Sequence, residues 1–143
     1  MQFVDIRIIN ELEYDKMYAL RHAVLRVPLG LNLYAQNFST EQDYIKIGAF
    51  VQDNLVGCVL VEFLPNHIAK IRQMALDTNY HRLGIGGKLM LFAEQICVQY
   101  DIKTIVMHAR LSAKLFYESA GYQAVGNEFL EVTIPHIIMQ KKL

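Results

Sequence analysis

Residues 74–90 have the sequence MALDTNYHRLGIGGKLM, and this stretch decides the fold. An apolar strand at residues 74–76 leads into a polar turn and then into glycines at 84, 86 and 87. Apolar residues recur at helical spacing from Ile85 onward. Glycine lets the backbone approach a ligand closely, and the first amides of a helix have no partner within it. The stretch therefore predicts a site for a phosphate or pyrophosphate at the start of the helix.

Two common phosphate-binding motifs do not fit these glycines. A dinucleotide-binding fingerprint requires a third glycine where this chain has Leu89, and a P-loop requires Ser or Thr after Gly87-Lys88. On the glycines alone, an ordinary strand–turn–helix junction remains an alternative. The segment 81–86, HRLGIG, resembles the coenzyme A loop of the GNAT N-acetyltransferases, whose pattern is Arg/Gln-x-x-Gly-x-Gly/Ala. His81 departs from that pattern, so the resemblance rests on the backbone amides of the loop.

The predicted elements alternate strands and helices in the same order as the GNAT fold. A strand at 3–9 precedes a helix that begins at Asn10, with Glu13 completing a capping box, and ends at Pro28 and Gly30. A long loop over 27–43 leads to an antiparallel meander. We expect an α/β protein with a mixed central sheet flanked by helices, forming one domain over 1–143. The remaining predicted ranges are strands 44–51, 55–63 and 68–76, a helix to about 100, strand 103–108, helix 112–120, and closing strands 122–125, 129–132 and 136–140.

Two further segments add to the resemblance. Residues 109–122, ARLSAKLFYESAGY, resemble the family element Ala-x-x-Phe-Tyr-x-x-x-Gly-Phe/Tyr, and many members carry Asn where this chain has Arg110. Residues 129–139, FLEVTIPHIIM, resemble a GNAT branch of small bacterial ElaA-like and YjcF-like proteins. Three such segments in the right order make chance an inadequate explanation.

The resemblance implies direct transfer of an acetyl group from acetyl-CoA to an amine, with no metal. The amide of Met74 would face the thioester carbonyl as an oxyanion donor, and the strand it belongs to would pair with the pantetheine arm. Tyr117 would protonate the leaving thiolate, although residues 115–117 also fit the buried face of a helix. The residues that the resemblance assigns to acetyl-CoA are Met74, Ala75, Leu76, His81, Arg82, Leu83, Gly84, Ile85, Gly86, Gly87, Lys88, Arg110, Ala113, Phe116 and Tyr117.

A base must take a proton from the acceptor amine before it attacks, and the sequence leaves its identity open. Glu62, His108, Glu131 and His136 are candidates, and a chain of water molecules is an equal alternative. Each also has a structural interpretation. Glu62 fits a solvated charge at a strand edge, His108 a hydrogen-bonded imidazole, and His136 a group that fixes the last hairpin.

The acceptor is expected in a cleft between the 27–43 loop, through Tyr34, and the hairpin that carries Glu131 and His136. Strand alternation puts Arg72 and Met74 on one side and residue 73 on the other. Arg72 fits either a substrate carboxylate or an ion pair with Glu62 across the sheet.

The composition narrows the choice of partner. The 143 residues are 53% hydrophobic, with 14 basic and 14 acidic residues and no basic stripe, which argues against nucleic acid. Cys58 and Cys97 lack metal-site spacing and indicate buried thiols in a reducing compartment. No apolar run approaches ~18 residues, so we expect a cytoplasmic protein without a membrane partner.

These observations favour a small-molecule amine acceptor and leave a homodimer open. The alternatives are a non-catalytic acyl-CoA-binding or sensor module with the same fold, and an unrelated protein that binds NAD or ATP.

Overall fold

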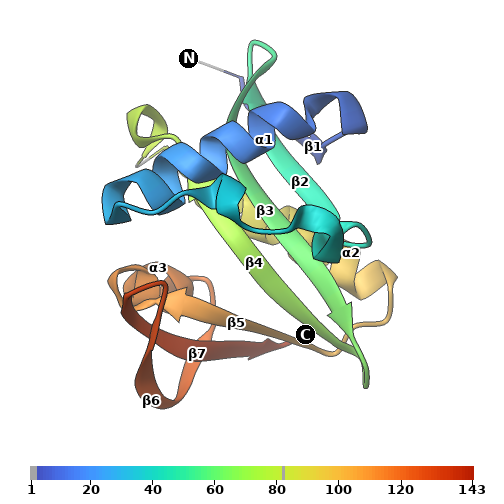
Figure 1. The fold of residues 1–143 in the computed structure, drawn as a ribbon. Coiled ribbons are helices and arrows are strands. Elements are labelled where there is room, and N and C mark those ends of the chain that lie inside the picture. The colour runs from blue at the N-terminus through green and yellow to red at the C-terminus, as the bar shows by residue number, and fades with distance from the viewer. Residues whose placement is uncertain (1–2, 82) are drawn as a thin grey trace.

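The computed structural model describes residues 3–81 and 83–143, which form a seven-stranded sheet in the order β1-β2-β3-β4-β5-β7-β6 (Figure 1). Neighbouring strands are antiparallel except β4 and β5, which are parallel. The predicted mixed sheet and the β2–β3–β4 meander are confirmed. The strands are β1 (Asp5–Ile8), β2 (Ile45–Val51), β3 (Asn54–Leu64), β4 (Ile68–Leu76), β5 (Thr104–Arg110), β6 (Gln123–Glu131) and β7 (Ile134–Lys142).

Helices cover both faces of the central strands (Figure 1). The strands alternate their side chains, so Ile47 and Val59 pack with α2 (Ile85–Gln99), while Phe50 and Leu60 pack with α1 (Tyr14–Arg21). A third helix, α3 (Lys114–Ser119), follows β5. Burial on both faces explains why β2 and β3 are apolar almost throughout.

The first helical segment begins and ends where the sequence predicts, with a 3-10 turn, Glu11–Glu13, ahead of α1. The capping box is present, and the amide of Asn10 donates to the Glu13 carboxylate at 3.1 Å. A π-helical segment, His22–Arg26, and a 3-10 turn, Val27–Leu29, extend α1 to Gly30, whose φ of 71° is left-handed. The helix therefore carries Arg26 to the middle of the sheet, beside β4.

The parallel pair β4–β5 separates after four residues. Pairing runs from Ile68↔Thr104 to Ile71↔Met107, whereas β5 stays paired with β7 to its end at Arg110. The rest of β4 remains with β3, so the sheet opens into two halves between β4 and β5 (Figure 1). This opening positions the candidate site.

A β-bulge in β4 lies beside the opening. Gln73 has a left-handed φ of 56°, and neither Gln73 nor Met74 has a partner in the β3–β4 register. The predicted alternation is therefore wrong at this point, because Gln73 and Met74 line the same cavity. Arg72 instead pairs with Glu62.

Two other expectations can be compared with the structure. The predicted strands 122–125 and 129–132 are one strand, β6, because the irregularity between Val125 and Phe129 is a bulge with Gly126 at a φ of 78° and not a turn. Cys58 and Cys97 are buried, as predicted, and burial raises the pKa of their thiols to about 12 and about 11. Within the described residues, the helices are too short or too polar to cross a membrane.

Candidate active site

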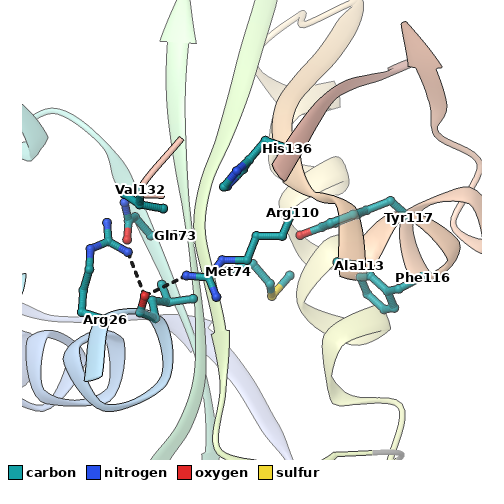
Figure 2. Close-up of a pocket in the computed structure, with 10 residues that line it drawn as sticks. Arg26, Gln73, Met74, Arg110, Ala113, Phe116, Tyr117, Val132 and His136 are labelled. Atoms are coloured by element: carbon teal, nitrogen blue, oxygen red, sulfur yellow. Dashed lines mark hydrogen bonds between the residues drawn. The ribbon is translucent and has the colours of Figure 1, made fainter. Parts of the chain in front are cut away.

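Two cavities meet where β4 and β5 separate. The larger has a volume of about 520 Å³ and the smaller about 190 Å³, and they share Met74, Ala113 and Phe116. The larger is also lined by Val24, Leu76, His81, Gly84, Ile85, Gly86, Gly87 and Ser112. The smaller is also lined by Leu25, Arg26, Gln73, Arg110, Tyr117, Val132 and His136 (Figure 2).

The larger cavity lies at the N-terminus of α2. Gly84 caps the helix with a φ of 75°, and the first bond into the helix runs from the Lys88 amide to the Gly84 carbonyl at 3.2 Å. The amides of residues 85–87 thus precede the first intrahelical acceptor, as at any helix start. Among the described residues, none lies within 4 Å of a β-carbon built at Gly87, whereas a β-carbon at Gly86 would lie 3.1 Å from Cζ of Phe116. These amides and the helix dipole favour an anion.

Of the other residues predicted to bind the coenzyme through this loop and strand, His81 lines the cavity, whereas Ala75, Leu83 and Lys88 do not. His81 is exposed, and its Nε2 lies 3.2 Å from the Leu76 carbonyl. Leu83 and Lys88 are exposed beside the loop, and Ala75 is buried against α1. Arg82 lies outside the described residues. The predicted loop and the strand that precedes it are therefore brought to one cavity.

Tyr117 lies at the back of the smaller cavity. Its ring is buried, and its hydroxyl points into the cavity toward Arg110 (Figure 2). Burial raises the pKa of this phenol to about 12, although the charge of Arg110 opposes the shift. The hydroxyl therefore stays protonated at neutral pH, as a proton donor must.

His136 is the second protonatable group in this cavity. It is buried at 3% exposure, and its Nδ1 lies 2.9 Å from the Ile134 carbonyl. Because a carbonyl can only accept, Nδ1 carries the proton in the neutral ring and Nε2 is left as the acceptor. Nε2 lies 3.7 Å from the Glu131 carboxylate.

Glu131 connects His136 to His108, whose Nδ1 lies 2.9 Å from the same carboxylate. Burial disfavours ionisation of Glu131, but the His108 hydrogen bond and nearby positive charges outweigh it, so its pKa lies below the ordinary value. His108 itself does not line the cavity. Among the described residues, no group of three His, Cys, Asp or Glu side chains is arranged to hold a metal ion. Glu131 is thus placed to stabilise a protonated His136.

Arg26 and Gln73 line the smaller cavity, and the sequence did not predict either of them as a site residue. A basic residue at the end of a helix is common without any ligand, so Arg26 gave no separate signal. Gln73 acquires its position from the bulge, which no local pattern predicts. Arg110 was predicted to bind the coenzyme, and the structure places it in the smaller cavity.

The predicted catalytic and acceptor residues that line neither cavity are Glu62, Arg72, Tyr34, His108 and Glu131. Glu62 and Arg72 form an ion pair of 2.7 Å, which is the second of the two interpretations of Arg72. Tyr34 is half exposed, packs against His22 with ring centres 5.2 Å apart, and is not among the described residues that line either cavity. The cleft is walled by Leu25 and Arg26, which precede the loop that was expected to wall it.

Known proteins resemble this chain in sequence and in architecture. The model of the acetyltransferase (GNAT) domain family matches residues 29–143. A candidate acetyltransferase of Bacillus subtilis strain 168 is 27% identical over 139 residues, which cover 95% of this chain and 94% of that protein.

Solved structures share the fold across the whole chain. A candidate N-acetyltransferase from Lactobacillus plantarum has a TM-score of 0.88 at 24% identity, covering 98% of both chains. ElaA of Escherichia coli has a TM-score of 0.80 at 18% identity, covering 99% of both chains. The PaiA N-acetyltransferase of Thermoplasma acidophilum, solved in complex with coenzyme A, has a TM-score of 0.80 at 16% identity and the same coverage of 99%.

Proposed function

Because this chain belongs to the GNAT acetyltransferase family, we propose that it transfers the acetyl group of acetyl-CoA directly to the amine of a small molecule. The observation that carries the proposal is the junction of the two cavities at Met74. One cavity has an anion-binding helix start, and the other has a phenol and an imidazole. The smaller cavity, at about 190 Å³, lies below the ~300–1,000 Å³ of most ligand pockets and favours a small acceptor.

The residues of the larger cavity fit a coenzyme A molecule. Its lining is mostly apolar, as a pantetheine arm requires, and the glycines at its end leave room for a pyrophosphate beside the helix amides. When bound, acetyl-CoA would supply an acetyl thioester that an amine can attack and a thiol that can leave.

The chain's own groups would handle the charge and the protons. Met74 lies outside the β3–β4 register and beyond the last β4–β5 pair, which supports a role in which its amide would donate to the developing oxyanion. His136 Nε2 would take the proton that the acceptor amine loses, with Glu131 stabilising the imidazolium. Tyr117 would give its proton to the departing sulfur.

The experiment is a ligand screen followed by a transfer assay. Thermal unfolding would be measured with CoA, acetyl-CoA, NAD and ATP, since a ligand of the native state raises stability by mass action. Release of free thiol from acetyl-CoA would then be followed with a panel of small primary amines. Stabilisation by CoA and amine-dependent thiol release are expected. Stabilisation by CoA without turnover on any amine would favour a sensor module, and stabilisation by NAD or ATP alone would contradict the proposal.

A further inference from the structure

The arginines of the described chain fall into two groups. Arg7, Arg21 and Arg72 each hold a glutamate carboxylate within 2.8 Å. Arg26 and Arg110 have no carboxylate at ion-pair distance among residues 3–81 and 83–143. These two arginines are also the ones that line the smaller cavity.

Both of these guanidinium groups donate to one carbonyl oxygen. Arg110 Nη2 lies 2.7 Å and Arg26 Nη1 lies 3.2 Å from the oxygen of Leu25 (Figure 2). One neutral oxygen satisfies few of the ten N–H donors that two guanidinium groups present. Burial and the charge of Arg110 lower the pKa of Arg26, and burial lowers the pKa of Arg110. An anion between the two groups would relieve both the repulsion and the loss of solvation.

Gln73 adds an independent observation in the same cavity. Its Oε1 is buried and has no hydrogen-bond partner in the part of the chain that the structure describes. Most buried polar atoms have a partner, so an isolated acceptor in a cavity wall points to a donor on a ligand. An amine is such a donor. Two cations and one free acceptor in one cavity are complementary to a molecule that carries both a carboxylate and an amine.

The position of Gln73 in the smaller cavity fits the transfer reaction. Gln73 precedes Met74, where the two cavities meet, so an amine held there lies next to the acetyl group. Arg26 lies at the end of the segment that continues α1, and its guanidinium group meets that of Arg110 at the Leu25 carbonyl. A planar carboxylate suits the forked donors of arginine. A phosphate dianion fits less well than a carboxylate. The negative charge of Glu131, which raises the pKa of Arg26, would repel the second negative charge of the phosphate.

We propose that the acceptor is a small amino acid or a related molecule, whose carboxylate binds between Arg26 and Arg110 while its amine lies between Gln73 and Met74. This inference rests on the acetyl transfer proposed above and specifies its substrate class. It replaces Arg72, which is already paired with Glu62, as the group that binds a substrate carboxylate.

The test compares matched acceptors and matched variants. Small amino acids, their carboxamides and aminoalkyl phosphates of equal length would be assayed for acetylation, and their binding to the CoA-loaded protein would be measured by calorimetry. The variants are Arg26→Gln, Arg110→Gln and the corresponding lysine substitutions. Arg7→Gln, on the far edge strand, is the control for loss of an arginine outside the cavity.

We expect the parent to prefer an amino acid over its carboxamide by about ten-fold or more in kcat/KM, as for a charged hydrogen bond. Either glutamine variant should abolish this preference, because it should raise KM for the amino acid about ten-fold more than KM for the carboxamide. The lysine variants should restore part of the preference for the amino acid, because lysine keeps the positive charge but lacks the forked donors of arginine. Equal rates for the parent on both acceptors, a preference for the phosphate, or an equal loss on both acceptors would overturn the carboxylate site.

The two proposals fail in different ways. If no acceptor is acetylated but amino acids bind, and both glutamine variants abolish that binding, the carboxylate site stands and the transfer function is wrong. If carboxamides are acetylated as fast as amino acids, the transfer function stands and the carboxylate site is wrong. If amino acids neither bind nor react, the carboxylate site is wrong whatever the other amines do.

Discussion

The ring of Phe116 lies over the α-carbon of Gly86, so that a β-carbon at Gly86 would lie 3.1 Å from Cζ of the ring. The contact joins the start of α2, on one side of the opening in the sheet, to α3 on the other. It leaves room for glycine, and Phe116 would have to move by a few tenths of an ångström for any larger residue.

Substitution of the glycine loop tests the anion site. Gly86→Asp should weaken CoA binding by more than ten-fold, because like charges at ~4 Å repel by about 4 kcal/mol at an effective dielectric of ~20. Binding would be measured by calorimetry. Gly87 has open space beside it, so Gly87→Asp and its neutral counterpart Gly87→Asn separate charge from steric effects. Parental CoA affinity in both aspartate variants would show that the loop is not the pyrophosphate site.

Removal of the Tyr117 hydroxyl tests the proton donor. Tyr117→Phe keeps the ring's packing, so unfolding in urea and CoA affinity should stay near parental, while kcat should fall by about ten-fold or more. An acid must be protonated to act, so its activity is lost as pH rises through its pKa. Because burial raises this pKa to about 12, kcat should show no loss from Tyr117 ionisation across the neutral range. Lower stability with unchanged turnover would instead identify Tyr117 as a core residue.

Substitutions of His136 and Tyr34 distinguish an acceptor site in the observed cavity from an acceptor site in the cleft predicted from the sequence. His136→Gln preserves much of the side-chain volume and should lower kcat by about 10²-fold, a typical contribution of a general base, without changing acetyl-CoA affinity. Tyr34→Ala, outside the cavity lining, should leave acceptor kinetics within about three-fold. Steady-state kinetics on one acceptor would measure both. The opposite pattern would return the acceptor site to the 27–43 loop.

The loop over 27–43 is anchored by a buried ion pair. Arg21 binds both oxygens of Glu41 at 2.8 and 2.7 Å, and both residues are at most 5% exposed. Glu41→Gln should lower the free energy of unfolding by about 3–5 kcal/mol, because it leaves a buried charge without its partner.

Urea unfolding measures this effect against Glu13→Gln, which breaks the more exposed Arg7–Glu13 pair and should cost about 1 kcal/mol or less. Equal effects of the two substitutions would show that burial of the Arg21–Glu41 pair does not matter.

Local sequence patterns were enough to predict several elements of the fold. Strand β4, the glycine turn and α2 follow from apolar spacing and from glycine's freedom at Gly84, where φ is 75°. The capping box at Asn10 and the buried thiols follow from equally local signals. Such features depend only on residues that are close in the chain, so they can be predicted without knowledge of the fold.

Only the tertiary structure decided which charges meet at the site. Arg26 and Arg110 are far apart in the chain and come together at Leu25 because the segment that continues α1 and the end of β5 both reach the opening in the sheet. Arg72 pairs across β3 and β4, which removes it from the site. The bulge at Gln73 reverses the expected strand alternation, because one residue in a left-handed conformation shifts every side chain after it. Long-range packing and a single backbone irregularity decided these positions, and neither leaves a periodic trace in the sequence.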